Sequence, residues 1–165
     1  MKREQVTAVV ILILAAIAAV FLSQSEREFR SKHHSKAVIN IRYENEKLYK
    51  VDYKTIKNIK NATFKTNFKD EISIYTGIQL KEIFEYLNIK TNHKNKIIVN
   101  GLDGYTVSFS HDEVLMDDNV YIVYRADGMF LKSMEDSGPG PYLAIVRKDR
   151  YFSRWCKWVT EIQIQ

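Results

Sequence analysis

The sequence contains one cysteine in 165 residues, and this scarcity limits the chemistry available to the chain. A single cysteine cannot form an internal disulfide, so Cys156 gives no indication of a redox compartment. The histidines His33, His34, His93 and His111 have no partner at a spacing typical of a nucleophilic or metal site. Both common glycine-rich phosphate loops are absent from the sequence. We therefore predict no catalytic residue and no metal ligand.

The excess of positive charge is small and is not concentrated on one element. The chain carries 25 basic and 20 acidic side chains, which give a formal net charge of +5. Nucleic-acid-binding proteins usually gather basic residues on one helix or face, and no segment here does so. Hydrophobic residues make up 45% of the chain, which fits one packed domain with an appendage. The sequence therefore predicts no nucleic-acid partner.

Residues 6–22 form a long apolar run that contains no charge and no proline. Its seventeen residues would form a helix of about 25 Å, just short of a hydrocarbon core of about 30 Å. The run ends in a poor signal-peptidase site, and no cysteine follows it for lipid attachment. We predict that residues 1–22 are a retained membrane anchor. A cleaved secretory signal and a buried core helix are the alternatives.

The basic residues near the anchor decide its expected orientation. Lys2 and Arg3 favour a cytoplasmic N-terminus, although basic residues between positions 27 and 36 weaken this bias. We expect a single-pass protein of a bacterial-type cell membrane, with its domain on the extracytoplasmic side, or a secreted protein if the signal is cleaved. Residues 23–36 are polar and predict a solvated tether or a frayed helix extension. The adjacent pair His33 and His34 would diverge on a helix and is not expected to bind a metal.

Residues 37–165 are predicted to form an α+β domain with a mixed sheet. About eight or nine short strands are indicated by alternating or apolar runs, without a regular β-α-β order. The clearest helix is expected to open at Thr76–Gly77, before an apolar stripe that begins at Leu80. Ser110 and Glu113 form a capping box that begins a further short helix. The domain is therefore expected to contain two or three short helices, besides the hydrophobic helix at the N-terminus.

Five segments of this domain resemble, in order, the molybdopterin-binding domain of sulfite-oxidase-type oxidoreductases. The family pattern has a Tyr/Trp-x-Gly-x-x-Leu turn, an Asp-Gly-Tyr turn, a bulky apolar strand, a Gly-Gly-Pro loop and a Lys-Trp-Val strand. The matching segments are Tyr75-Thr-Gly-Ile-Gln-Leu-Lys-Glu-Ile-Phe84, Gly101-Leu-Asp-Gly-Tyr-Thr-Val-Ser-Phe109, Asp118-Asn-Val-Tyr-Ile-Val-Tyr124, Gly138-Pro-Gly-Pro-Tyr-Leu143 and Arg154-Trp-Cys-Lys-Trp-Val-Thr-Glu-Ile162. The match covers roughly residues 40 to 164 and implies the mixed fold of that family.

The departures from the family pattern concern the cofactor. The resemblance implies a molybdenum-ligating cysteine just before the turn at Tyr75, but residues 63–74 contain no cysteine. Thr66 or Asn67 is a poor substitute for a thiolate. The family's Gly-Gly-Pro-x-Arg is Gly-Pro-Gly-Pro-Tyr here and ends at Tyr142, so an anion-binding arginine is missing. The chain resembles a minimal pterin-binding protein without the metal ligand. We predict no cofactor; a pterin or molybdopterin held without cysteine ligation is the alternative.

The strongest candidate ligand contacts lie near the C-terminus. Lys157 matches a family lysine that contacts the cofactor phosphate, and Arg154 could hold the same anion; a solvated strand face is the alternative. Trp155 and Trp158 are expected on opposite faces of a strand, so that one joins the core and the other either stacks on a flat ligand or covers the sheet. Cys156 is expected to behave as a small buried hydrophobe.

Two turns supply the remaining candidate contacts. Asp103 and Tyr105 flank Gly104 and either contact a ligand or form a tight turn in which the tyrosine closes the core. Gly138 opens the rigid loop before Tyr142. A concave pocket lined by Lys157 is expected beside Gly138 and Pro139.

Three functions follow from these observations. We predict a non-catalytic, membrane-anchored domain on the extracytoplasmic side that binds a small anionic or flat ligand, or a membrane protein partner. A pterin- or molybdopterin-dependent oxidoreductase, or a subunit of one, is the alternative. A pure protein-interaction module is the second alternative, and it would show an exposed apolar patch in place of a pocket.

Overall fold

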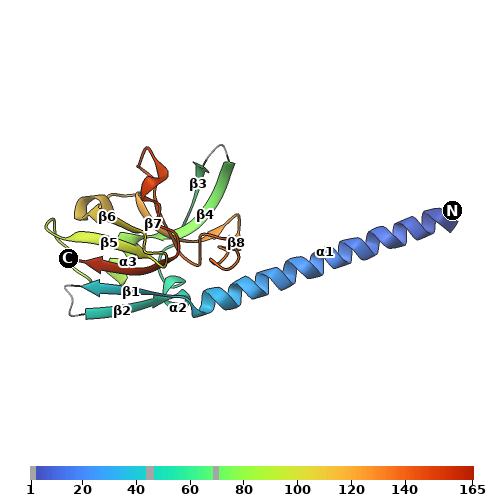
Figure 1. Cartoon of the computed structure of the whole chain (residues 1–165), viewed down its shortest axis with the longest axis horizontal. Helices are drawn as coiled ribbons and strands as arrows, with labels where there is room; N and C mark the ends of the chain where they lie inside the picture. The colour runs from blue at the N-terminus through green and yellow to red at the C-terminus, as the bar shows by residue number, and fades with distance from the viewer. Residues whose placement is uncertain (1–2, 44–46, 69–70) are drawn as a thin grey trace.

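A single helix, α1 (Arg3–Lys36), precedes the domain and extends away from it (Figure 1). The computed structural model describes residues 3–43, 47–68 and 71–165. The apolar part of α1 has a mean hydropathy of 2.5 and none of it is buried, so the helix is long and apolar enough to span a membrane. A signal sequence near the N-terminus has the same character. The alternative of a buried core helix is wrong. The predicted anchor begins at Met1 and Lys2, which lie outside the described residues.

Residues 23–36 continue α1 without a break as far as Lys36. Arg30 and His34 are only 9% and 1% exposed, because the last turns of the helix pack against the domain. The expectation of a solvated tether is therefore wrong at these two positions. The helix contacts α2 (Tyr53–Ile56) and β8 (Met129–Phe130), so the end of the apolar helix is fixed to the globular part.

One of the two sheets has five strands in the order β2-β1-β10-β5-β6. These strands are β1 (Val38–Tyr43), β2 (Lys47–Asp52), β5 (Lys96–Gly101), β6 (Thr106–Ser110) and β10 (Val159–Ile164). β1 pairs in parallel with β10, with Asn40 opposite Glu161, and the other neighbouring strands are antiparallel. The predicted mixed sheet is confirmed.

The other sheet is antiparallel and carries the candidate site. Its strands are β3 (Ala62–Phe68), β4 (Glu71–Gln79), β7 (Val120–Ala126) and β8, in that order, and β9 (Leu143–Val146) also pairs with β7. Along β7, Ile122 joins the main core, whereas Tyr121 and Val123 join a smaller core cluster on the other face. Both faces of β7 are therefore buried, which explains its nearly continuous apolar sequence.

In the described part of the chain, three short helices complete the domain, as the sequence predicts, together with one 3-10 turn that it does not predict. They are α2, α3 (Leu80–Tyr86), α4 (His111–Leu115) and η1 (Phe152–Arg154). The capping box of Ser110 and Glu113 at the start of α4 is confirmed. The predicted helix start at Thr76–Gly77 is wrong, because both residues belong to β4. A side chain at Gly77 would lie 2.6 Å from the Ile122 carbonyl oxygen, so glycine allows a close approach of two strands there.

Candidate functional site

A concave pocket of about 530 Å³ lies where β4 meets the C-terminal segment before β10. It is the pocket expected beside the loop at Gly138 and Pro139. Aromatic and apolar side chains form most of its wall, with Lys157 as the charged residue. The lining residues are Tyr75, Ser137, Gly138, Pro139, Leu143, Phe152, Trp155, Lys157 and Trp158. This volume lies within the range of about 300 to 1,000 Å³ that is typical of small-molecule sites.

Aromatic rings make up one wall of this pocket. The rings of Tyr75 and Trp155 lie edge to face with centroids 6.0 Å apart, and those of Phe152 and Trp155 are 4.9 Å apart. Burial raises the pKa of the Tyr75 hydroxyl, so this group stays protonated at neutral pH. The sequence reasoning did not propose Tyr75 or Phe152 as contacts. A signal for Phe152 was present, because it precedes Trp155 by three residues and a 3-10 turn brings such residues together.

Trp155 and Trp158 line the same pocket, so the prediction that they point to opposite faces of a strand is wrong. The segment is not a regular strand: Cys156 forms an isolated bridge with Ala144, and β10 begins only at Val159. Trp158 has a φ of 51°, which turns its side chain back toward the loop before β9. Its indole Nε1 donates a hydrogen bond to the Gly138 carbonyl oxygen at 2.6 Å.

Gly138 is buried in the loop before β9. A Cβ atom at this position would lie 2.2 Å from the Cβ of Lys132 and 2.3 Å from its carbonyl oxygen. The Gly138 N–H donates to the Ser133 carbonyl at 2.8 Å, and the Trp158 N–H donates to the Pro139 carbonyl at 3.0 Å. These bonds hold the loop against the segment that carries both tryptophans, so the pocket wall is preorganised.

Lys157 supplies the positive charge of the pocket. Its side chain is exposed, and Nζ lies 5.7 Å from the centroid of the Trp158 ring. No carboxylate in the described part of the chain pairs with it. A cation that no acidic side chain neutralises, beside aromatic faces, suits a ligand that is both flat and negatively charged.

Arg154 does not line the pocket and is not positioned with Lys157. Its Nε donates to Asp149 Oδ2 at 2.7 Å, and its Nη1 donates to Glu113 Oε1 at 2.7 Å. Hydrogen bonding to Asp149 and Glu113 outweighs burial and raises the pKa of Arg154. Two carboxylates therefore neutralise this guanidinium, which connects η1 to the start of α4. The structure thus separates two residues that the sequence grouped as one anion site.

Asp103 and Tyr105 form the tight turn that the sequence predicts. Asp103 Oδ1 accepts a hydrogen bond from the Tyr105 N–H at 3.0 Å, and Gly104 has a φ of 83°. Tyr105 is 44% exposed rather than buried in the core, and its hydroxyl donates to the Ser153 carbonyl oxygen. The turn therefore supports η1, and neither residue lines the pocket.

Cys156 is fully buried, which confirms that it behaves as a small hydrophobe. Its Sγ lies 3.7 Å from the Tyr105 carbonyl oxygen and 3.6 Å from the Lys157 carbonyl oxygen. Burial, with a smaller contribution from Asp103, raises the pKa of the thiol to about 12. A protonated, enclosed thiol is a poor metal ligand, because the thiolate form is needed.

The comparisons with known proteins agree with this fold. A family model described as the oxidoreductase molybdopterin binding domain matches residues 38–165, and the chain therefore belongs to this family. Among solved structures, the sulfane dehydrogenase SoxCD from Paracoccus pantotrophus aligns with a TM-score of 0.64 at 15% sequence identity. The alignment covers 79% of this chain and 38% of that one, and at this identity it shows the fold alone. No curated protein gives a significant match.

The residues of the pocket fit the pterin of the family's cofactor better than its molybdenum. Aromatic faces and Lys157 suit a pterin ring and an anionic group. The metal requires a thiolate, and the stretch where the family pattern places it contains none. Thr66 lies there in β3, opposite Ser73 of β4, and carries only a hydroxyl group. The single thiol of the chain is enclosed by backbone carbonyls at Cys156. The pocket therefore fits a pterin and lacks the soft ligand that would hold molybdenum.

Proposed function

We propose that the protein is a membrane-anchored, extracytoplasmic domain that binds a flat anionic ligand of the pterin class without catalysing a redox reaction. One observation carries the proposal: Tyr75, Trp155 and Trp158 line one pocket together with Lys157, which no carboxylate in the described part of the chain neutralises. A family scaffold for molybdopterin makes a pterin the ligand class of choice. The missing thiolate supports a binding role.

Each part of the pocket has a distinct task in this proposal. The rings of Trp155 and Trp158 would cover the faces of the ligand, and the phosphate or another anionic group would approach Lys157 Nζ. The Trp158 indole N–H already donates to Gly138, so this ring stays in place before the ligand arrives. Preorganisation of this kind lowers the entropy lost on binding. No residue of the pocket is assigned a proton or electron transfer.

The anchor and its orientation complete the proposal. The large apolar side chains of α1 from Val9 to Leu22 are exposed, which suits contact with lipid, and the helix continues unbroken to Lys36, next to the domain. Lys2 and Arg3 before the apolar run favour a cytoplasmic N-terminus. The domain would then lie outside the cytoplasm, held close to the membrane surface.

Native mass spectrometry and metal analysis of the full chain, purified in detergent from a host that makes molybdopterin, test the proposal. We expect a bound pterin without stoichiometric molybdenum. Lys157→Ala should lose the ligand, whereas Lys148→Ala, at an exposed lysine outside the pocket, should retain it. Stoichiometric molybdenum would instead favour the oxidoreductase alternative. If the purified chain carries no pterin and added pterin does not quench its tryptophan fluorescence, the pterin proposal is wrong.

A further inference from the structure

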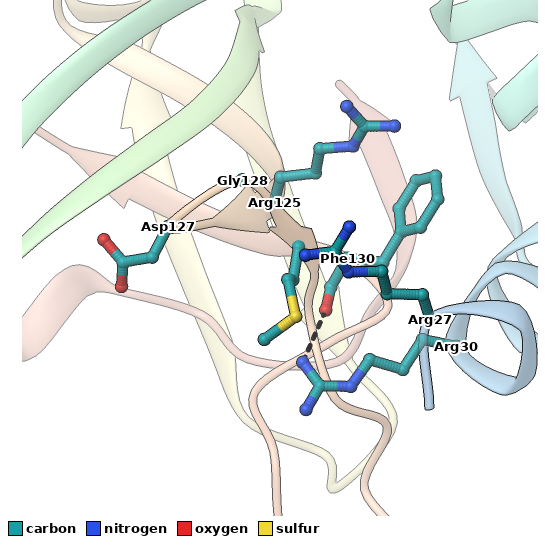
Figure 2. A pocket seen from close by; sticks show the side chains of 7 residues that line it. Arg27, Arg30, Arg125, Asp127, Gly128 and Phe130 are labelled. Atoms are coloured by element: carbon teal, nitrogen blue, oxygen red, sulfur yellow. Dashed lines mark hydrogen bonds between the residues drawn. The ribbon is translucent and has the colours of Figure 1, made fainter. Parts of the chain in front are cut away.

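A second cavity lies at the junction of α1 with the hairpin of β7 and β8, and it shares no lining residue with the pterin pocket. It has a volume of about 250 Å³. Three of its lining residues are arginines: Arg27 and Arg30 come from the helix, and Arg125 comes from β7. The other lining residues are Asp127, Gly128, Met129 and Phe130. Figure 2 shows Arg27 and Arg30 reaching from the helix toward the hairpin.

We propose that this arginine pocket binds the phosphate headgroup of an anionic phospholipid. The inference rests on the proposed membrane anchoring of α1, and it adds a lipid ligand that the pterin pocket does not involve. Guanidinium groups suit phosphate oxygens because their N–H donors match the oxygen spacing.

The charges of the pocket are only partly neutralised within the chain. Arg30 pairs with Glu26 one turn before it and donates to the Phe130 carbonyl oxygen at 3.3 Å. The Asp127 Oδ1 atom accepts the Ile74 N–H at 2.9 Å, and Figure 2 shows its carboxylate pointing away from the arginines. No acidic side chain in the described ranges pairs with Arg27 or Arg125. The guanidinium groups of Arg27 and Arg125 are therefore available to an anion.

Arg125 is preorganised for this role. Its guanidinium carbon lies 4.5 Å from the centroid of the Phe130 ring, and its Nη2 lies 3.4 Å from the Tyr53 hydroxyl. Its Nε is buried and has no hydrogen-bond partner in the described part of the chain. An unsatisfied buried donor is costly, and an oxygen-rich headgroup would relieve this cost.

The distance from the apolar run places the pocket at the height of lipid headgroups. Arg27 lies five positions after Leu22, a rise of about 7.5 Å along the helix. The headgroup layer extends about 5 to 7.5 Å beyond the hydrocarbon core on each side. Arg27 therefore lies at the outer edge of this layer, where its side chain can reach a phosphate. Because α1 is unbroken from the apolar run to the residues that contact β8, the distance between the apolar run and the pocket is fixed.

Lipid retention by the full chain tests this proposal. The protein is placed in nanodiscs of equal phosphatidylglycerol and phosphatidylcholine, and native mass spectrometry counts the lipids that stay bound. We expect preferential retention of one phosphatidylglycerol. Arg27→Gln, at an exposed position, should lower this preference about tenfold, since it removes a charge-assisted hydrogen bond to the phosphate. Arg125→Gln should act in the same direction.

A matched control separates the pocket from general attraction to a charged surface. Lys32 lies exposed on the same end of α1 but does not line the pocket, so Lys32→Gln should leave the preference unchanged. Equal losses in Lys32→Gln and Arg27→Gln would overturn the pocket proposal. Equal retention of the two lipids by the unmodified chain would overturn it as well, while the anchor would stand.

Two further outcomes distinguish the sources of phosphate and the role of the anchor. If 10 mM inorganic phosphate, in phosphatidylcholine nanodiscs, raises the melting temperature as much as phosphatidylglycerol does, the site is one for free phosphate and the lipid assignment is wrong. If the chain fails to enter phosphatidylcholine nanodiscs at all, the proposed anchoring fails and the lipid ligand fails with it.

Discussion

His34, near the end of α1, stacks on Phe130 of β8 with ring centroids 4.5 Å apart and planes inclined by 30°. The rings of Tyr142 and Tyr53 contact the imidazole edge to face, with ring centroids 4.8 Å and 5.1 Å away from it. The imidazole is 1% exposed and belongs to the polar part of the helix, beyond the apolar run. This contact and the hydrogen bond of Arg30 to the Phe130 carbonyl oxygen join the helix to β8.

The stability of this junction should depend on pH. Burial lowers the pKa of His34 from its ordinary value of 6.5 to about 4. The positive charge of Arg125 lowers this pKa further, whereas the backbone of Pro141 raises it in part. The unfolded chain therefore binds more protons between these two pKa values. Stability is highest above pH 6.5 and falls as pH decreases toward 4, by about 2 kcal/mol between pH 7 and pH 5.

Chemical denaturation of the full chain in detergent at pH 7 and pH 5 measures this dependence. His34→Phe keeps an aromatic ring between Phe130 and the two tyrosines but removes the titrating group. The stability of this variant should therefore change much less between the two pH values. A variant with the same pH dependence as the unmodified chain would show that another group is responsible.

Lys157 and Arg154 should give opposite results, although they are three residues apart. Arg154→Ala removes the ion pairs with Glu113 and Asp149 and should lower the free energy of unfolding by about 1 kcal/mol, since these side chains are partly exposed. Lys157→Ala should leave stability nearly unchanged and weaken pterin binding. Thermal unfolding and fluorescence titration of both variants test this separation; loss of pterin affinity in the Arg154 variant with intact stability would contradict it.

Gly138→Ala should destabilise the domain by about 1 to 3 kcal/mol, because the added methyl group overlaps Lys132. The displaced loop should also disturb the hydrogen bond from the Trp158 indole and alter its fluorescence. Gly104→Ala is the comparison: its φ is positive but its surroundings are open, so we expect a cost of about 1 kcal/mol and an unchanged tryptophan spectrum. Equal spectral changes in both variants would argue against the role of Gly138.

The Cys156 thiol should resist alkylation in the folded protein. Burial raises its pKa to about 12, so the thiolate is scarce at neutral pH, and the sulfur is enclosed. Iodoacetamide labelling followed by mass spectrometry should give no adduct under native conditions and full labelling in denaturant. Rapid native labelling would show that the segment before β10 opens, and that Cys156 is available as a ligand after all.

Features that depend on residues close together in the chain could be predicted from the sequence. The apolar run, broken only by Thr7, predicted the helix of residues 6–22. The spacing of Ser110 and Glu113 predicted the start of α4, and Asp103–Gly104 predicted a turn. The order of the five motifs predicted the family, which the match over residues 38–165 confirms. Local hydrogen bonds and side-chain periodicity encode these features without reference to distant parts of the chain.

The side chains that meet at each site could not be predicted from the sequence, because they depend on how distant segments pack. The left-handed backbone at Trp158 turned both tryptophans into one pocket, whereas a regular strand would have separated them. Arg154 found its partners at Asp149 and Glu113, 5 and 41 residues away, and left Lys157 as the pocket's cation. His34 became buried because β8 folds against α1. Such contacts depend on strand order and on where loops return, which periodicity along the chain does not specify.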